Sequence, residues 1–373
     1  MLKRTVAIAS VGLFLASTGA WAQNVGTGLE PTPDQETTRV ATRGANFLEI
    51  PVGARGQALG GAGMALIRGV EAMAWNVAAI AETEKFSVGW SYSDLYKGAD
   101  ITHQFGGLIL PLNDVSSLGV SLVSLQSGDM LRTTEGFPDG GDPVFGETFE
   151  FSAFATSVAY SRLITDRLGV GFALKFVSEG ITSARATWVG GDVGALFRTG
   201  LLGTTIGGAI TNVGGESSIG GPGINQTIGA GADAFPTGDN VDIKLDTKAL
   251  LLPTAFRFSA LFDVTGTPEA WFPQTGPNHN LRLMLDFYDS ISSPLQPSVG
   301  LEYAFQDYFF ARLGKRWLNE DRTGGFRDFW TGAALGAGVK FPIGEYSLGV
   351  DYAFTDRSEL GNTQTFSINF GSF

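Results

Sequence analysis

The stretch Leu168-Gly-Val-Gly-Phe-Ala-Leu-Lys-Phe176 alternates between large apolar residues and small or polar ones. Alternation with a period of two predicts a β-strand that has one apolar face. The same pattern recurs at 256–263, 299–306 and 346–354. We therefore expect most of the chain to form antiparallel strands, each with a large apolar face and a smaller, glycine-rich opposite face.

Two architectures bury one apolar face of an antiparallel sheet. In a soluble sandwich this face points into the core, whereas in an outer-membrane β-barrel it points into lipid. The predicted strands have about 9–11 residues, which cross a bilayer when tilted. Aromatic residues also recur near strand ends, where they would form interfacial girdles. We therefore predict the barrel and keep a periplasmic sandwich as the alternative. The girdle candidates are Trp90, Tyr92, Tyr160, Tyr288, Trp317 and Tyr352.

The sequence accommodates fourteen strands. Connections after even-numbered strands are mostly short and those after odd-numbered strands mostly long, which is typical of outer-membrane barrels. The exception is 264–278, a long connection after the eighth strand. The predicted strands are 84–93, 101–111, 117–127, 147–161, 166–178, 190–198, 204–212, 254–263, 279–288, 296–306, 308–317, 332–341, 344–354 and 364–372. The predicted long loops are 128–146, 179–189, 213–253, 318–331 and 355–363.

Composition excludes several classes of protein. The 373 residues include 52 glycines and no cysteine, and the formal net charge is −12. The absence of cysteine excludes disulfide scaffolds, thiolate metal sites and cysteine nucleophiles. The acidic charge argues against a nucleic-acid-binding protein. The loop acids Asp233, Asp239, Asp242 and Asp246 have no EF-hand spacing, so we favour a solvated acidic loop over a calcium site. We expect no metal and no cofactor.

The N-terminus has the pattern of a secretory signal peptide. Lys3 and Arg4 precede an apolar stretch, which ends in the cleavage signal Ala20-Trp21-Ala22. A membrane anchor is the alternative interpretation. We therefore expect a signal peptide at 1–22, a flexible lead-in at 23–42, an N-terminal hatch at 43–83 and the barrel at 84–373, in the outer membrane of a Gram-negative-type bacterium.

Residues 43–83, here called the hatch segment, are rich in alanine and show helical spacing near their end. This composition does not fit a spanning strand, and the segment is long enough to fill the lumen as a plug. The glycines at 60, 61 and 63 invite comparison with a phosphate-binding loop. However, no strand precedes them and no Lys-Ser/Thr pair follows, so tight turns inside the lumen are the better account.

The hatch segment also resembles a known family. The stretches Phe47-Leu-Glu-Ile-Pro-Val-Gly-Ala-Arg55, Ala58-Leu-Gly-Gly-Ala62 and Trp75-Asn76-Val-Ala78 resemble the start of PorV/PorQ-family outer-membrane proteins. That family is itself similar to FadL-type transporters of hydrophobic compounds. Weaker landmarks follow at 128–130, 210–214, 252–257 and 351–354. The chain departs from the family pattern at Val77, where the family has proline, and at 67–70, where the family has acidic residues.

The resemblance implies a fourteen-stranded barrel with a hatch. Within the hatch we single out Gly53, Arg55, Gly60, Gly61, Gly63, Trp75 and Asn76. On the predicted lumen face we single out Lys175, Arg257, Asp286, Glu302 and Asp351, for which we favour an internal salt-bridge network over a polar conduit.

An enzyme is not expected. His103 shares a strand face with Phe105 and Ile109, which we interpret as facing lipid, so an interfacial girdle is favoured over a catalytic site. His279 has the same interpretation. The favoured hypothesis, which the PorV resemblance implies, is binding of exported cargo proteins for type IX secretion and surface attachment. The alternative is FadL-like transport. Expected partners are outer-membrane lipid, cargo proteins with secretion-system components, or a hydrophobic ligand, and nucleic acid is not expected.

Overall fold

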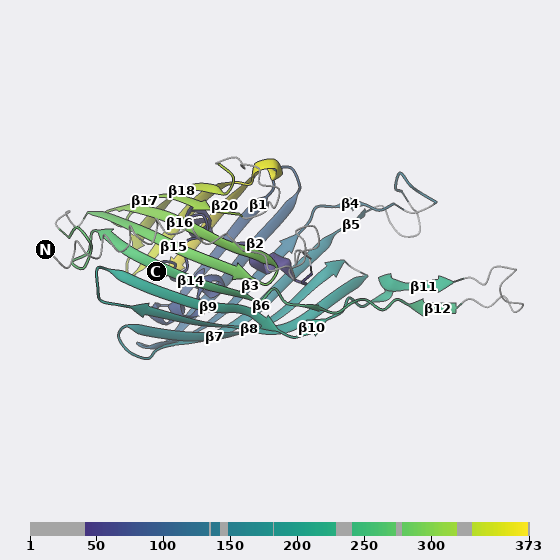
Figure 1. Ribbon diagram of the computed structural model, residues 1–373, viewed down its shortest axis with the longest axis horizontal. Helices are drawn as coiled ribbons and strands as arrows, with labels where there is room; N and C mark the ends of the chain where they lie inside the picture. Colours follow the sequence, from purple (N-terminus) through teal and green to yellow (C-terminus); the bar gives the residue numbers. More distant parts are fainter. Residues whose placement is uncertain are drawn as a thin grey trace, which may run out of the picture. The chain divides into compact units, whose positions relative to one another are not determined.

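The computed structural model describes residues 42–133, 136–141, 148–181, 183–228, 241–273, 278–318 and 330–371. Within these residues, fourteen antiparallel strands close into one barrel, whose first and last strands, β1 and β20, pair through Val88↔Phe370 to Asp94↔Gln364 (Figure 1). Each predicted strand overlaps an observed one. The fold class is therefore confirmed. The predicted signal peptide and nearly all of the lead-in lie outside the described residues.

The barrel strands follow one another in chain order around the wall. They are β1 (Ser87–Leu95), β2 (Ile101–Asn113), β3 (Ser116–Gln126), β6 (Phe151–Leu163), β7 (Leu168–Ile181), β8 (Ala184–Arg198), β9 (Thr204–Gly214), β14 (Ala255–Thr265), β15 (His279–Ser290), β16 (Ser293–Phe305), β17 (Phe309–Arg316), β18 (Ala333–Ile343), β19 (Tyr346–Asp356) and β20 (Asn362–Gly371).

The two ends of the barrel differ in their connections. One end, here the turn end, carries mostly short links, such as that between β18 and β19. The other, here the loop end, carries two-stranded ribbons, two of which reach beyond the barrel in Figure 1. This asymmetry makes the loop end the outer one. The ribbons are β4 (Met130–Leu131) with β5 (Thr148–Phe149), β10 (Glu216–Ser217) with β13 (Leu250–Leu251), and β11 (Asn225–Ile228) with β12 (Val241–Lys244), and the short helices η5 (Pro222–Ile224) and η6 (Ser358–Leu360) also lie in loops.

One predicted loop is wrong. The sequence predicts a long connection at 179–189, but β7 and β8 continue to a tight turn and pair up to Ile181↔Ala184. The added pairs extend the wall at the loop end. Arg185 on β8 donates from Nη1 to Ser152 Oγ on β6 at 3.0 Å. This hydrogen bond passes over β7, so it joins three neighbouring strands and supports the extension.

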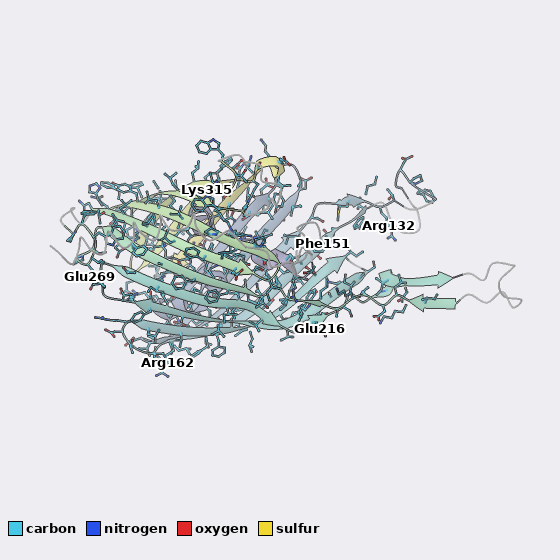
Figure 2. All side chains as sticks on the ribbon, in the orientation of Figure 1. Arg132, Phe151, Arg162, Glu216, Glu269 and Lys315 are labelled. Carbon is cyan, nitrogen blue, oxygen red and sulfur yellow. The ribbon has the colours of Figure 1, made fainter. Side chains whose placement is uncertain are left out.

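Exposure alternates along the strands as a membrane barrel requires. Phe172 and Leu174 are exposed, whereas Ala173 between them is buried. Charged side chains lie at both ends of the barrel, as Figure 2 shows for Arg162 and Glu269 at the turn end and for Arg132 and Glu216 at the loop end. The apolar exterior fits the hydrocarbon layer of a bilayer. Within the described residues, no helix is long and apolar enough to cross a membrane.

The hatch segment fills the lumen and forms the core of the molecule. Its helical turns are η3 (Asn46–Glu49), α2 (Ala54–Ala58), α3 (Ala72–Trp75) and η4 (Val77–Glu82). Leu59, Met64 and Ile80 are fully buried in one apolar cluster together with wall residues such as Phe105 and Met284. Burial of apolar surface, worth about 25 cal/mol per Å², therefore holds this segment inside the barrel.

Glycines on the lumen face let the hatch backbone approach the wall. A Cβ atom on Gly314 would collide with the backbone of Leu59 and Gly60, and one on Gly171 would lie 2.8 Å from the carbonyl of Val77. The small lumen face of the strands therefore has a direct cause, which is that two backbones meet there without side chains between them.

Two orientation predictions are wrong. His103, Phe105 and Ile109 face the lumen and are buried, not exposed to lipid. Tyr288, predicted for a girdle, is also buried inside. The face of β2 that carries Phe105 and Ile109 can point inward because the hatch presents an apolar surface to it. His279, in contrast, lies outside, with Nδ1 2.7 Å from Tyr303 Oη.

Adding one methyl group to the wall at Gly314 tests the close packing. We expect Gly314→Ala to displace the hatch and to lower the stability by about 1–3 kcal/mol, the usual cost of overpacking. Gly208→Ala is the matched control, because a Cβ atom there meets nothing within 4 Å. The readouts are the thermal midpoint in detergent and protection of the hatch from protease. Equal stability of the two variants would contradict the packing described.

Candidate functional site

Three cavities surround the hatch segment. The outer vestibule, at the loop end, has a volume of about 690 Å³ and is lined by residues that include Glu49, Tyr288 and Arg316. The hatch cleft, between residues 47–52, α3 and the wall, has about 40 Å³. The charged cavity, at the turn end, has about 420 Å³. These spaces, with the side chains between them, form the candidate site.

A buried carboxylate ties the hatch to the wall. Glu302 on β16 is fully buried and receives Arg55 of α2, with Nη2–Oε1 at 2.7 Å and Nε–Oε2 at 2.9 Å. Arg312 on β17 donates from Nε to the same carboxylate at 2.7 Å, and Arg282 lies at 3.1 Å. Arg312 also reaches Asp351 on β19 at 2.5 Å. The geometry is bidentate for Arg55, which favours one fixed position of α2.

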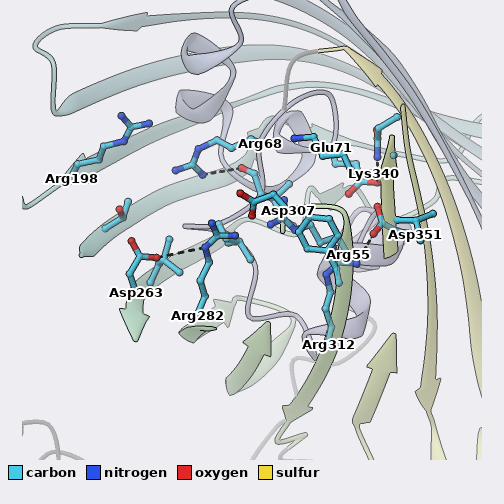
Figure 3. Close-up of a pocket in the computed structure, with 18 residues that line it drawn as sticks. Arg55, Arg68, Glu71, Arg198, Asp263, Arg282, Asp307, Arg312, Lys340 and Asp351 are labelled. Carbon is cyan, nitrogen blue, oxygen red and sulfur yellow. Dashed lines mark hydrogen bonds and ion pairs between the residues drawn. The ribbon is translucent and has the colours of Figure 1, made fainter. Parts of the chain in front are cut away.

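The charged cavity is close to charge balance (Figure 3). Arg68 and Arg198 share Glu82, at 2.5 and 2.7 Å, on one side of it. An apolar solute would find no favourable surface in this space, since ionic groups would lose water to admit it. Its cations are Arg55, Arg68, Arg198, Arg282, Arg312 and Lys340, its lining acids are Glu71, Asp263, Asp307 and Asp351, and Glu82 and Glu302 pair with its arginines.

Glu71 is a buried acid of the hatch. Its Oε1 accepts from Asn369 Nδ2 at 3.2 Å. Burial raises the pKa of the Glu71 carboxyl group, and the nearby charge of Asp351 raises it further. Gly53, with a φ of +80°, lies against this carboxyl group, and a side chain at position 53 would collide with it. Glycine at 53 therefore allows both the turn and the placement of Glu71.

Wall side chains hydrogen-bond to the hatch backbone. Ser161 Oγ donates to the carbonyl of Ala78 at 2.8 Å, and Ser367 Oγ accepts from the amide of Ala54 at 2.7 Å. Asp286, singled out from the sequence, accepts from the amide of Met64 at 3.3 Å and from Ser259 Oγ. Short helical turns leave many backbone groups unpaired, and these wall residues supply the missing partners.

The other predicted hatch residues have separate structural roles. Asn76 donates from Nδ2 to the carbonyl of Ala195 on β8 at 2.9 Å, and its Oδ1 accepts from the amide of Ala78 as the cap of η4. Trp75 donates from Nε1 to the carbonyl of Val52 at 2.9 Å. Gly60 and Gly61 have positive φ values of 65° and 90°. Gly63 packs against Ile67, and a Cβ atom there would lie 2.7 Å from its Cδ1.

Lys175 lies where the wall ladder is interrupted. Between β8 and β9 the register shifts between Gly191 and Val193. Asp192 turns inward at this point, where it binds Lys175 Nζ at 2.7 Å and accepts from the amide of Asn212 at 2.8 Å. Lys175 also donates to Asn212 Oδ1 at 2.8 Å. The interruption is therefore filled by a polar cluster, and Lys175 also lines the hatch cleft.

Arg257 differs from the other predicted lumen residues. Its guanidinium carbon lies 4.7 Å from the ring centroid of Trp75 and 4.7 Å from that of Tyr288. Arg316 lies 5.3 Å from the same Tyr288 ring. The structure thus places Lys175, Glu302 and Asp351 in ion pairs, whereas Arg257 stacks between aromatic rings of the hatch and the wall.

Four residues of the site were not identified from the sequence, and these are Arg282, Arg312, Arg316 and Asp192. The three arginines lie on the same strand face as glycines or as residues that the sequence did identify. The alternation of the strands therefore indicated that they point inward. Asp192 also follows the inward phase of its strand, in step with Gly190 and Gly194, because the extra residue of the register shift lies on β9. Within the described residues, no group of three or more metal-binding side chains is present.

Sequence comparison finds no matching family model and no matching curated protein. Comparison with solved structures does find matches. The toluene transporter TodX of Pseudomonas putida is 13% identical, with a TM-score of 0.53 and coverage of 90% of this chain and 98% of that one. The fold is FadL-like. The toluene transporter TbuX of Ralstonia pickettii is 13% identical, with a TM-score of 0.51 and coverage of 86% and 98%.

A FadL homologue of Pseudomonas aeruginosa also matches, at 15% identity and a TM-score of 0.47, with coverage of 86% of this chain and 98% of that one. At these identities the likeness to TodX and TbuX establishes the fold alone. The closed antiparallel barrel and its apolar exterior assign the chain to the outer membrane. TodX and TbuX are transport proteins by description, and the PorV/PorQ resemblance stays a prediction.

The role of Glu302 can be tested by removing its charge. We expect Glu302→Gln to destabilise the folded barrel by about 3–5 kcal/mol, because the arginines around it would remain buried without their shared partner. The thermal midpoint measures the effect. Glu345→Gln is the matched control, since Glu345 pairs with Lys85 at the exposed turn end and should give no measurable change. A Glu302→Gln midpoint equal to that of the control would contradict the role of Glu302 in tying the hatch to the wall.

Proposed function

We propose that the protein is an outer-membrane channel for a hydrophobic small molecule, gated by the hatch segment. The observation that carries this proposal is the hatch cleft, where apolar hatch side chains face apolar wall side chains next to the outer vestibule. Glu49, Ile50 and Pro51 line both spaces, so only this short stretch separates them. The FadL-like fold supports the proposal, because toluene transporters share it.

The cleft is closed in this conformation. A volume of about 40 Å³ is far below the roughly 300–1,000 Å³ of a ligand pocket. A ligand therefore has to displace hatch residues from the wall. Its apolar surface would replace the contacts that Phe47, Val52 and Met73 lose, which limits the free-energy cost of opening.

The exit from the cleft is also constrained. An apolar solute that entered the charged cavity below the hatch would displace water from the ionic side chains there, which is unfavourable. Lys175 belongs both to the cleft lining and to the interruption between β8 and β9. In our proposal the ligand passes beside the hatch toward this part of the wall and avoids the charged cavity.

Locking the hatch to the wall tests the gate. Ala58 of α2 and Ala353 of β19 are buried in one small cluster, and the chain has no cysteine of its own. We expect the oxidised double variant Ala58→Cys, Ala353→Cys to lose uptake of radiolabelled toluene into proteoliposomes, and reduction to restore it. The two single-cysteine variants are the controls. Undiminished uptake by the oxidised protein would show that this part of the hatch does not gate transport.

A second function rests on the loop-end ribbons. Leu131, Phe149, Ile219, Leu245 and Leu251 are exposed at the loop end, beyond the strands that fit a bilayer. Exposed apolar side chains outside the bilayer are typical of interaction surfaces. They support the alternative that a PorV/PorQ-like barrel receives exported cargo proteins for type IX secretion and surface attachment.

Gentle extraction from native outer membranes followed by mass spectrometry separates the two functions. The cargo hypothesis predicts large exported proteins in near-stoichiometric amount, and their loss when residues 219–248 are replaced by a short glycine-serine linker. The channel hypothesis predicts hydrophobic small molecules without such proteins, and unchanged uptake by the same variant. Uptake that depends on residues 219–248 would contradict the assignment of the channel to the hatch.

A further inference from the structure

A groove on the outer side of the wall takes no part in the proposed channel. It has a volume of about 660 Å³ and is lined mainly by β16, β17 and β18, which are neighbours in the barrel (Figure 1). Leu313 and Leu335 line it and are exposed, whereas Arg312, next to Leu313 in the chain, is buried. The groove therefore lies on the face of the barrel that contacts the membrane.

A small side chain makes this part of the face concave. Ala333 on β18 faces outward and pairs with Lys315 on β17. Larger side chains stand around it, among them Leu313, Leu335 and Trp330, and they line the same groove. An empty hollow in a hydrocarbon layer loses dispersion contacts on one side. A flexible acyl chain can restore these contacts, because it can follow the shape of the groove.

Lys315 places a positive charge at one end of the groove. It follows Leu313 by two positions, so it faces the same side of β17, and its ladder partner Val299 lines the groove as well. Lys315 Nζ donates to the carbonyl of Thr331 at 2.5 Å, which fixes the position of the ammonium group. A lysine on the lipid face is destabilising in a depth-dependent way. An anionic group at the same depth would compensate its charge.

This lysine lies at the outer boundary of the hydrocarbon layer. Arg316, the next residue, ends β17 and lines the outer vestibule on the inner side of the wall. Trp330 beside the groove is 63% exposed, as is typical of aromatic residues at a membrane interface. Asp356 also lines the groove, and its Oδ2 accepts from the amide of Ser358 at 3.3 Å. The groove therefore leads from the level of the lipid headgroups into the apolar layer.

We propose that this groove binds an acyl chain of a phosphorylated lipid of the outer leaflet, and that Lys315 binds the phosphate group of that lipid. Lipid A, the phosphorylated and acylated glycolipid of this leaflet, has the required chemistry. A second copy of the chain is the competing occupant, because it too could cover the apolar surface. It would not bring a phosphate group to Lys315, and the charge at the end of the groove therefore favours the lipid. The site lies outside the barrel and goes beyond the proposed channel function.

Two forms of one lipid test the role of the charge. Binding of lipid A and of dephosphorylated lipid A to the purified protein in a neutral detergent is measured by native mass spectrometry. We expect lipid A to bind about tenfold or more tightly, the scale of charge-assisted hydrogen bonds. Lys315→Gln should remove this preference. Asp356→Asn is the matched control, because it removes a charge of the opposite sign from the same groove, and it should not weaken the binding of lipid A.

Filling the groove tests the position of the acyl chain. We expect Ala333→Phe to weaken the binding of both lipids about tenfold or more, because the ring takes the space of several buried methylene groups. Ala311→Phe is the matched control and should bind as the native protein does, since Ala311 is an exposed residue of β17 outside the groove lining. If Ala333→Phe fails to fold, as judged by heat-modifiable migration, Ala333→Leu takes its place with a smaller expected loss.

The outcomes distinguish the two occupants. Equal affinity of the native protein for the two lipids would contradict the role of Lys315, and undiminished binding of lipid A by the folded Ala333 variant would overturn the groove as its site. A dimer that is free of lipid A and that Ala333→Phe dissociates would assign the groove to a second copy of the chain and overturn the lipid site. These measurements do not involve toluene uptake, so the channel function is tested separately.

Discussion

The close contact between the hatch backbone and the barrel wall is the constraint on which the structure depends. A barrel of fourteen strands is too wide for its own lumen side chains to fill, so the hatch segment supplies the core. At Gly171 and Gly314 no side chain fits between the two backbones. At these positions the strands can therefore keep large residues only on the lipid side. This requirement explains the glycines at the contacts between hatch and wall, and it strengthens the alternation of the strands that carry them.

Filling the lumen creates a second requirement, because the hatch is made of short helical turns with many unpaired backbone groups. Wall serines and Asp286 satisfy several of these groups, and the ion pairs around Glu302 fix α2 against three strands. Apolar contact holds the hatch in the barrel, whereas the polar contacts select one position for it. Displacing the hatch therefore costs most where Arg55 meets Glu302 and least where only apolar side chains touch.

The sequence alone predicted the strands and their faces wherever lipid imposes the pattern, as in 168–176. It failed on His103 and Phe105, because periodicity shows that two faces differ but not which face points inward. An apolar hatch makes an apolar lumen face possible, as on β2. The pairing of Arg55 with Glu302 could not be predicted from the sequence either. The two residues are 247 positions apart, and only the docking of the hatch brings them together.

The lumen is divided by the hatch into regions of opposite character. The turn end is ionic and close to charge balance, the cleft is lined mainly by apolar side chains, and Arg257 and Arg316 lie where the cleft approaches the outer vestibule. In the proposed channel, a ligand that enters from outside and the hatch compete for the same apolar wall, so the ligand needs an apolar body.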